Sequence, residues 1–153
     1  MTGIGGMIMR SRILSKGART TYILVFEEGE EVLKELSRFA SHSKLDAAEF
    51  TGLGALSEAV LGFWDVDAKD YHRIPVREQV EVLSFVGNIT TDDGEAKVHP
   101  HIVLAKRDGT AHGGHLLEAR VRPTLEVVVT EAPAHLKRRH DAATGLPLID
   151  LGA

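Results

Sequence analysis

The order of apolar and polar positions along the chain predicts one helix among several strands. Val32, Leu33, Leu36, Phe39 and Ala40 recur at the spacing of a single helical face. Acidic residues at positions 28–31 precede this stripe, where the positive end of a helix dipole favours them. The segment is therefore predicted to be an amphipathic helix with a structural role.

The rest of the pattern is typical of strands. Runs of β-branched and aromatic residues predict strands at 21–26, at 47–64 with a glycine-punctuated bend in its middle, at 80–89 and at 124–130. Polar segments at 65–71 and 90–95 predict turns, and 132–141 predicts a short turn or helix followed by a tail. One helix among many short strands indicates an α+β sheet domain.

Composition narrows the class of protein. A length of 153 residues suits one domain, which we expect over 9–153 behind a flexible, glycine-rich extension at 1–8. Eighteen basic against 22 acidic side chains oppose tight binding to nucleic acid without sequence preference. The sequence has no cysteine, so a metal site must use histidine, carboxylate or water. No segment resembles a membrane span or signal peptide, and we expect a cytoplasmic protein without membrane partners.

Three histidines are the strongest candidate for chemistry. His99 and His101 are two residues apart, so on a strand both side chains lie on one face. If 107–109 forms a three-residue loop with Gly109 in the left-handed conformation, Lys106 pairs with Thr110. His115 then lies across from His101 at about 5 Å. Three converging imidazoles suit a divalent transition metal, best zinc, with one position left for water or a ligand.

The convergence depends on the register of this hairpin. A two-residue turn at Asp108–Gly109 would send His115 to the opposite face and bring His112 round instead. A bulge at Gly113–Gly114 would again change the face of the strand on which His115 lies. The histidines could also be ordinary polar residues of a solvated face. Pro100 limits this strand to a sheet edge or a bulge, because proline cannot donate to a ladder.

The order of the motifs resembles a known family, the "plants and prokaryotes conserved" (PPC) domain, also called DUF296. The resemblance extends over residues 9 to 151 and includes segments 51–57, 82–89, 99–101, 108–109, 113–116, 126–129, 138–139 and 144–148. It implies a compact α+β domain with a largely antiparallel sheet and one main helix, assembled as a homotrimer. It also implies that His99, His101 and His115 hold zinc. Plant members join the domain to AT-hook peptides that bind DNA, but no Arg-Gly-Arg-Pro core occurs here.

These observations leave three functions to compare. The first is a trimeric zinc-binding domain that holds a small anionic ligand or a partner at a cleft between subunits. The second is a zinc-dependent lyase or hydrolase in which the metal activates water and Glu58 acts as the base or as a further ligand. The third is a DNA-associated regulatory protein, with contacts from basic residues such as Arg138 and Arg139. The sequence does not decide whether the chain is an enzyme.

Overall fold

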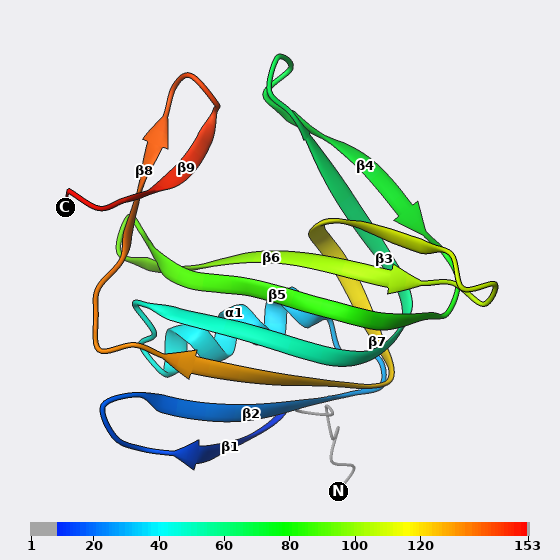
Figure 1. Ribbon diagram of the computed structural model, residues 1–153, viewed down its shortest axis with the longest axis horizontal. Coiled ribbons are helices and arrows are strands. Elements are labelled where there is room, and N and C mark those ends of the chain that lie inside the picture. Colours follow the sequence, from blue (N-terminus) through cyan, green and yellow to red (C-terminus); the bar gives the residue numbers. More distant parts are fainter. Residues whose placement is uncertain (1–8, 153) are drawn as a thin grey trace, which may run out of the picture.

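A computed structural model of the protein describes residues 9–152, and the extension predicted at 1–8 lies outside this range. The described residues form one helix and nine strands (Figure 1). In chain order these are β1 (Arg10–Ser15), β2 (Thr20–Glu27), α1 (Val32–His42), β3 (Ala48–Asp65), β4 (Asp70–Val76), β5 (Val80–Asp92), β6 (Glu95–Ala105), β7 (Ala111–Glu131), β8 (Lys137–Asp141) and β9 (Leu146–Asp150).

The sheet is largely antiparallel, in agreement with the predicted α+β class. Its main path runs β1–β2–β7–β3–β5–β8–β9, and β4 pairs with β3. Strand β6 pairs with β5 along one edge and with β7 along the other. Because β7 and β5 both also pair with β3, these four strands form a closed circuit. The one parallel pairing in the described range joins β5 to β8.

Helix α1 covers one side of this sheet, behind β3 and β5 in Figure 1. Its predicted stripe is confirmed, since Val32, Leu36 and Ala40 are buried and Leu33 and Phe39 pack against the core. The Glu31 side chain caps the helix by accepting from the Lys34 amide at 2.7 Å. Its other oxygen accepts from the Ala119 amide at 3.1 Å, which fastens the start of the helix to β7. No helix in the described range is long and apolar enough to cross a membrane.

The segment predicted as two strands joined by a bend at 47–64 forms one continuous strand, β3 (Ala48–Asp65). The register of β3 against β5 shifts between Gly52 and Gly54 without ending the strand. A Cβ atom at Gly54 would lie 2.3 Å from the Thr124 carbonyl oxygen of β7. The glycine therefore marks a close approach of two backbones, and the strand bends there without breaking.

The prediction for the C-terminal segment is wrong. Instead of a turn or helix and a tail, β8 and β9 form a hairpin. Its loop is closed by the Asp141 side chain, which accepts from the Thr144 amide and hydroxyl at 2.8 and 2.7 Å. Gly145 follows with a φ of +75°. Strand β8 consists of charged residues and histidine, so no alternation of apolar and polar positions predicts it.

Candidate metal centre

The histidine hairpin has the predicted three-residue loop. The Lys106 amide donates to the Thr110 carbonyl at 2.9 Å, and Gly109 adopts a φ of +82°. Strands β6 and β7 then pair without a shift from Ala105–Ala111 to His101–His115. His112 pairs with Leu104, so the alternative register is wrong.

The three imidazoles converge at the end of this ladder. His99 Nε2 lies 3.2 Å from His101 Nε2, and the ring of His115 is centred 5.4 Å from each of the other two rings. One ligand nitrogen from each residue lies within 4.8 Å of the other two. A tetrahedral zinc ion holds its nitrogen ligands about 3.4 Å apart, so small side-chain rotations suffice to bind it.

The backbone around the histidines is shaped by Pro100 and Gly87. Pairing between β6 and β7 ends at His101, so Pro100 lies at a local sheet edge, as its chemistry predicts. On its other side Pro100 pairs with Gly87 of β5. A Cβ at Gly87 would lie 2.2 Å from the His99 carbonyl oxygen. Glycine here lets β5 support the histidine strand closely.

Two aromatic residues of the β3–β4 hairpin support His115. The Tyr71 ring stacks on the His115 ring, with centroids 4.9 Å apart and planes 24° from parallel. Trp64 packs edge-on against Tyr71 at 4.9 Å. Sequence analysis missed both residues and placed Tyr71 in a turn, although it lies in β4. Neither carries a spacing signal that links it to the histidines.

The surroundings favour the neutral form of two of the imidazoles. Burial, followed by repulsion from His99, His101 and Lys97, lowers the pKa of His115 from 6.5 to about 4. Burial also lowers the pKa of His99, with Arg138 the next largest cause. The Nδ1 atom of His115 is buried and has no hydrogen-bond partner among residues 9–152. Neutral imidazole is the form that binds metal, so the site suits a cation.

Arg138 of β8 lies beside His99 and is held by three neutral acceptors. Its Nε donates to Thr90 Oγ1 at 2.8 Å, and Nη1 to the Pro147 carbonyl at 2.8 Å. Its Nη2 donates to Asn88 Oδ1 at 2.7 Å and lies 3.5 Å from His99 Nδ1. No carboxylate in the described range forms an ion pair with this half-buried guanidinium. Arg139, in contrast, faces away and pairs with Asp150.

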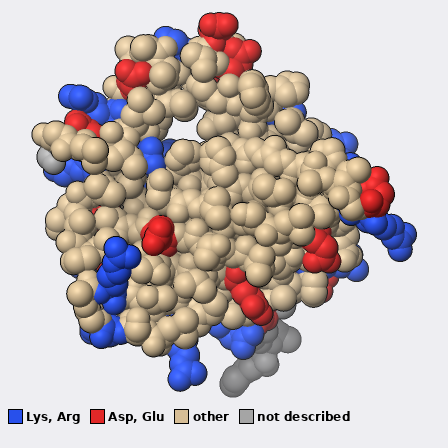
Figure 2. Space-filling model, in the orientation of Figure 1, with Lys and Arg blue, Asp and Glu red and all other residues tan. Residues whose placement is uncertain are grey.

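A cavity of about 460 Å³ opens beside the histidines. The β3–β4 hairpin and the β8–β9 hairpin meet above this cavity and form an arch. Trp64 Nε1 of the first donates to the Thr144 carbonyl of the second at 3.1 Å, and Lys69 Nζ of the first donates to the Ala142 carbonyl of the second at 2.6 Å. Figure 2 shows an opening between this arch, at the top, and the body of the molecule. The lining consists of Leu33, Trp64, Tyr71, Lys97, Val98, His99, Pro100, His115, Leu116, Leu117, Arg138, Gly145, Leu146, Pro147 and Leu148.

The structure does not bring Glu58 to the histidines. Glu58 lies on β3 four residues before Gly62, the partner of His115, which is about 13 Å along the strand. Its carboxylate instead faces Arg120, with a 3.7 Å ion pair. The group that suits a metal contains three histidines and no carboxylate. A reaction at this site would therefore need a base other than Glu58.

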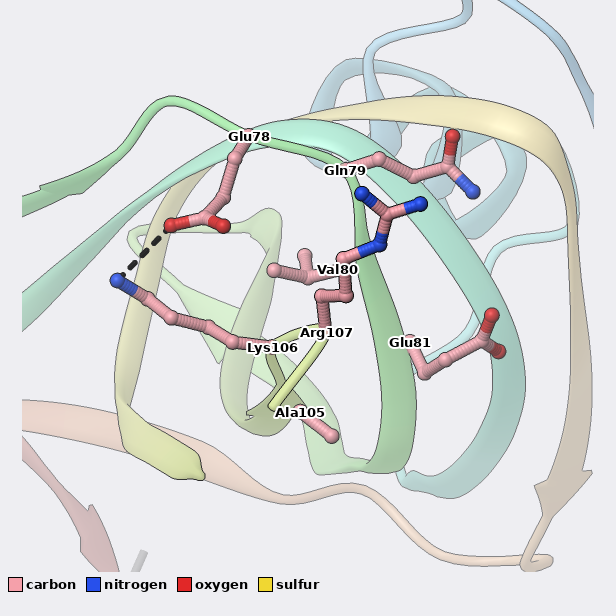
Figure 3. A pocket seen from close by; sticks show the side chains of 7 residues that line it. All are labelled: Glu78, Gln79, Val80, Glu81, Ala105, Lys106 and Arg107. Atoms are coloured by element: carbon pink, nitrogen blue, oxygen red, sulfur yellow. Dashed lines mark ion pairs between the residues drawn. The ribbon is translucent and has the colours of Figure 1, made fainter. Parts of the chain in front are cut away.

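A second cavity of about 490 Å³ lies at the opposite end of β5 and β6 and contains none of the predicted site residues (Figure 3). Lys106 reaches across it to Glu78, with an ion pair of 3.0 Å. Glu81 and Arg107 add one further charge of each sign. Its charges are balanced, and nothing in its lining favours a ligand of either sign.

The sequence of this chain places its fold and its histidine site in a known family. The sequence pattern of the Plants and Prokaryotes Conserved domain family, abbreviated PCC as well as PPC, matches residues 14–133. The chain belongs to this family. The C-terminal hairpin, with Arg138, lies beyond the matched range.

Individual relatives agree with this assignment. The bifunctional protein GlmU of Synechococcus sp. (strain JA-3-3Ab) is 31% identical over 139 residues, which are 89% of this chain and 21% of that protein. The chain thus spans about a fifth of that relative. A candidate DNA-binding protein of Bacteroides thetaiotaomicron has a similar structure, with a TM-score of 0.88, 26% identity and coverage of 96% of this chain and 100% of that one. A metal-containing protein of Archaeoglobus fulgidus has a TM-score of 0.79 at 28% identity, over 94% and 99% of the two chains.

Proposed function

We propose that this chain binds one zinc ion through His99, His101 and His115, assembles as a homotrimer and holds a small anionic ligand at a cleft between subunits. The convergence of three imidazoles, with no carboxylate among them, carries the proposal. Zinc held by three imidazoles keeps an open coordination position and acts there as a Lewis acid. The metal-containing relative from Archaeoglobus fulgidus supports the same assignment.

The residues around the histidines fit a metal ion. Burial and neighbouring cations keep His99 and His115 neutral, so both can offer a lone pair at neutral pH. The stacked Tyr71 ring fixes the orientation of His115. The Nδ1 atom of His115 also accepts or donates no hydrogen bond within the described part of the chain, which is consistent with a ring that binds a metal ion.

The positive charges beside the histidines support an anionic ligand. Arg138 and Lys97 both line the cavity, and neither forms an ion pair within the described residues. Together with a bound divalent cation they would give this cavity a concentrated positive charge, although the whole chain carries a net charge of −4. An anion would compensate that local charge.

An exposed apolar surface supports assembly with further copies of the chain. Leu53, Leu83, Val86 and Val103 lie on the outer face of β3, β5 and β6, with exposed fractions between 38% and 62%. Figure 2 shows that the face turned to the viewer carries few charged side chains. Val86 pairs with His101, whose side chain is also exposed, so this surface borders the histidines. A second copy that covered it would form a cleft at the metal site.

Elemental analysis of the untagged protein beside His115→Ala, with sedimentation of both, tests the proposal. We expect about one zinc per chain in the wild type, none in the variant, and a trimer in both. A wild type that stays metal-free after incubation with zinc would refute the metal site. A monomer would refute the cleft between subunits and leave the metal site standing.

DNA binding is a second candidate, supported by the Bacteroides thetaiotaomicron relative and by one surface. Arg12, Lys16 and Arg19 are exposed on β1 and its turn, in a stretch without acidic residues, whereas Arg10 beside them pairs with Glu27 of β2. Arg138 and Arg139 are less suited to DNA than the sequence predicted, because both are held by groups of this chain. Affinity for duplex DNA that falls steeply with salt, and less steeply in Arg12→Gln, would favour this candidate. Absence of binding at low salt would refute it.

A further inference from the structure

The cavity beside the histidines has positive charge without negative charge. Lys97 and Arg138 line it, and its lining contains no aspartate or glutamate. Asp92 acts on the Arg138 guanidinium from outside the cavity, but the two form no ion pair within the described residues. A half-buried cation without a counterion costs free energy, and an anion that enters the cavity recovers it.

Arg138 has the donors that such an anion requires. A guanidinium carries five N–H groups. Thr90, Asn88 and the Pro147 carbonyl take three of them, and His99 lies at the limit of hydrogen-bond distance from a fourth. At least one N–H therefore remains for a ligand. Because the other contacts fix the plane of the group, little conformational entropy is lost on binding.

The remaining walls of the cavity are mostly apolar. Leu117, Leu146 and Leu148 contribute aliphatic surface, and Trp64 and Tyr71 contribute aromatic surface. Such walls favour a ligand with an apolar body. They offer few further donors, whereas a phosphate group presents more oxygens and more charge than one guanidinium and one lysine can satisfy. A single carboxylate matches the available donors better.

We propose that this cavity binds a carboxylate with a small apolar body, whose charge is held by Arg138 and Lys97 and whose body lies beneath the arch of the two hairpins. The inference rests on the proposed anionic ligand and names its chemical class. The C-terminal hairpin is then part of the binding site, because it supplies Arg138 and the wall formed by 145–148.

Calorimetric titration with phenylacetate and phenylacetamide tests this, because the two probes share a shape and differ in charge. We expect phenylacetate to bind both zinc-loaded and chelator-treated wild type, and phenylacetamide to bind at least about tenfold more weakly. Arg138→Gln should weaken phenylacetate by at least about tenfold. The matched control Arg139→Gln, which changes the neighbouring arginine outside the cavity, should alter the affinity less than about twofold.

Near-ultraviolet circular dichroism would detect whether Arg138→Gln detaches the C-terminal hairpin from the sheet. In that case Lys97→Gln provides the decisive test. The Lys97 side chain is exposed and forms no ion pair with residues 9–152, so its loss should weaken phenylacetate about threefold and leave phenylacetamide unchanged. Equal affinity for the two probes, tighter binding of inorganic phosphate, or unchanged affinity in Lys97→Gln would overturn the proposal. Binding that depends on Arg138, in a wild type that takes up no zinc on incubation with the metal, would uphold this proposal and refute the zinc site. A protein that binds zinc but no phenylacetate would overturn the carboxylate proposal and leave the zinc site standing.

Discussion

Two cavities of nearly equal volume lie at opposite ends of β5 and β6, about 460 Å³ beside the histidines and about 490 Å³ beside Glu78. In the second cavity Lys106 is paired with Glu78, and the charges of both signs are balanced. In the first, three imidazoles and two cations converge without a carboxylate. The volume of a cavity therefore does not distinguish a candidate functional site. Ionisable groups without partners of opposite charge do.

The two cavities also differ in how the chain builds them. The cavity beside Glu78 is formed by residues 78–81 and 105–107, at one end of neighbouring strands. The cavity beside the histidines gathers residues from α1, β3, β4, β6, β7 and the C-terminal hairpin. Long-range construction of this kind fixes side chains by packing from several directions. It provides the preorganisation that binding sites require.

The largest expected effect comes from removing one of the three histidines. His115→Ala should weaken zinc at least about a hundredfold, because each ligand contributes roughly 3 kcal/mol to a zinc site. His112→Ala, which alters a histidine three residues earlier on the same strand, is the matched control and should retain the metal. Elemental analysis after dialysis against a mild chelator measures both. Retention of zinc by His115→Ala would remove the main contrast between the two cavities.

The backbone beneath the histidines gives the next effect. Gly87→Ala would place a Cβ 2.2 Å from the His99 carbonyl oxygen, so the two strands must separate. We expect the free energy of unfolding to fall by about 2–3 kcal/mol and the affinity for zinc to fall with it. Gly17→Ala, where nothing lies within 4 Å, should change stability by less than about 0.5 kcal/mol. Urea denaturation of the metal-free proteins compares them.

Acid should destabilise the histidine cavity of the metal-free protein. The pKa of His115 falls from 6.5 to about 4 on folding, so between these values the unfolded chain binds more protons. The stabilisation from neutral His115 is complete above pH 6.5 and is lost as the pH falls towards 4. Because the ring is only half-buried, we expect a loss of about 1–2 kcal/mol. Urea denaturation from pH 7 to 4 should show this slope, and His115→Asn should flatten it.

The smallest effect is expected at the second cavity. Lys106→Gln removes the ion pair with Glu78, whose side chain is 49% exposed, and should cost less than about 1 kcal/mol. Zinc content and phenylacetate affinity should stay at the wild-type values. A large change in either quantity would show that the two cavities are coupled through β6.

The histidine hairpin could be predicted from sequence because its rules are local. A period of two residues places His99 and His101 together, and a three-residue loop with glycine sets the register of His115. The helix followed from the spacing of its apolar stripe in the same way. The bound metal, the trimeric assembly and the ligand stay predictions, because strand periodicity, turn length and helical spacing do not determine them.

The arch over the cavity could not be predicted because long-range contacts hold it. Strand β8 has the sequence Lys-Arg-Arg-His-Asp, which lacks the apolar alternation of a strand. Its position depends on Arg138 reaching Asn88, 50 residues earlier, and on Trp64 reaching Thr144, 80 residues later. One local signal was available, because Asp141, Thr144 and Gly145 form a turn pattern between two short segments.

The bond between Trp64 and Thr144 has an optical consequence. Trp64 is the one tryptophan in the sequence, and its indole N–H is fastened to the tip of the C-terminal hairpin. Selective excitation of indole therefore addresses a single chromophore, placed where the two hairpins meet. Loss of this hydrogen bond would expose more of the half-buried indole to water and shift its emission to the red. The fluorescence of the unlabelled protein would thus distinguish an intact arch from a broken one.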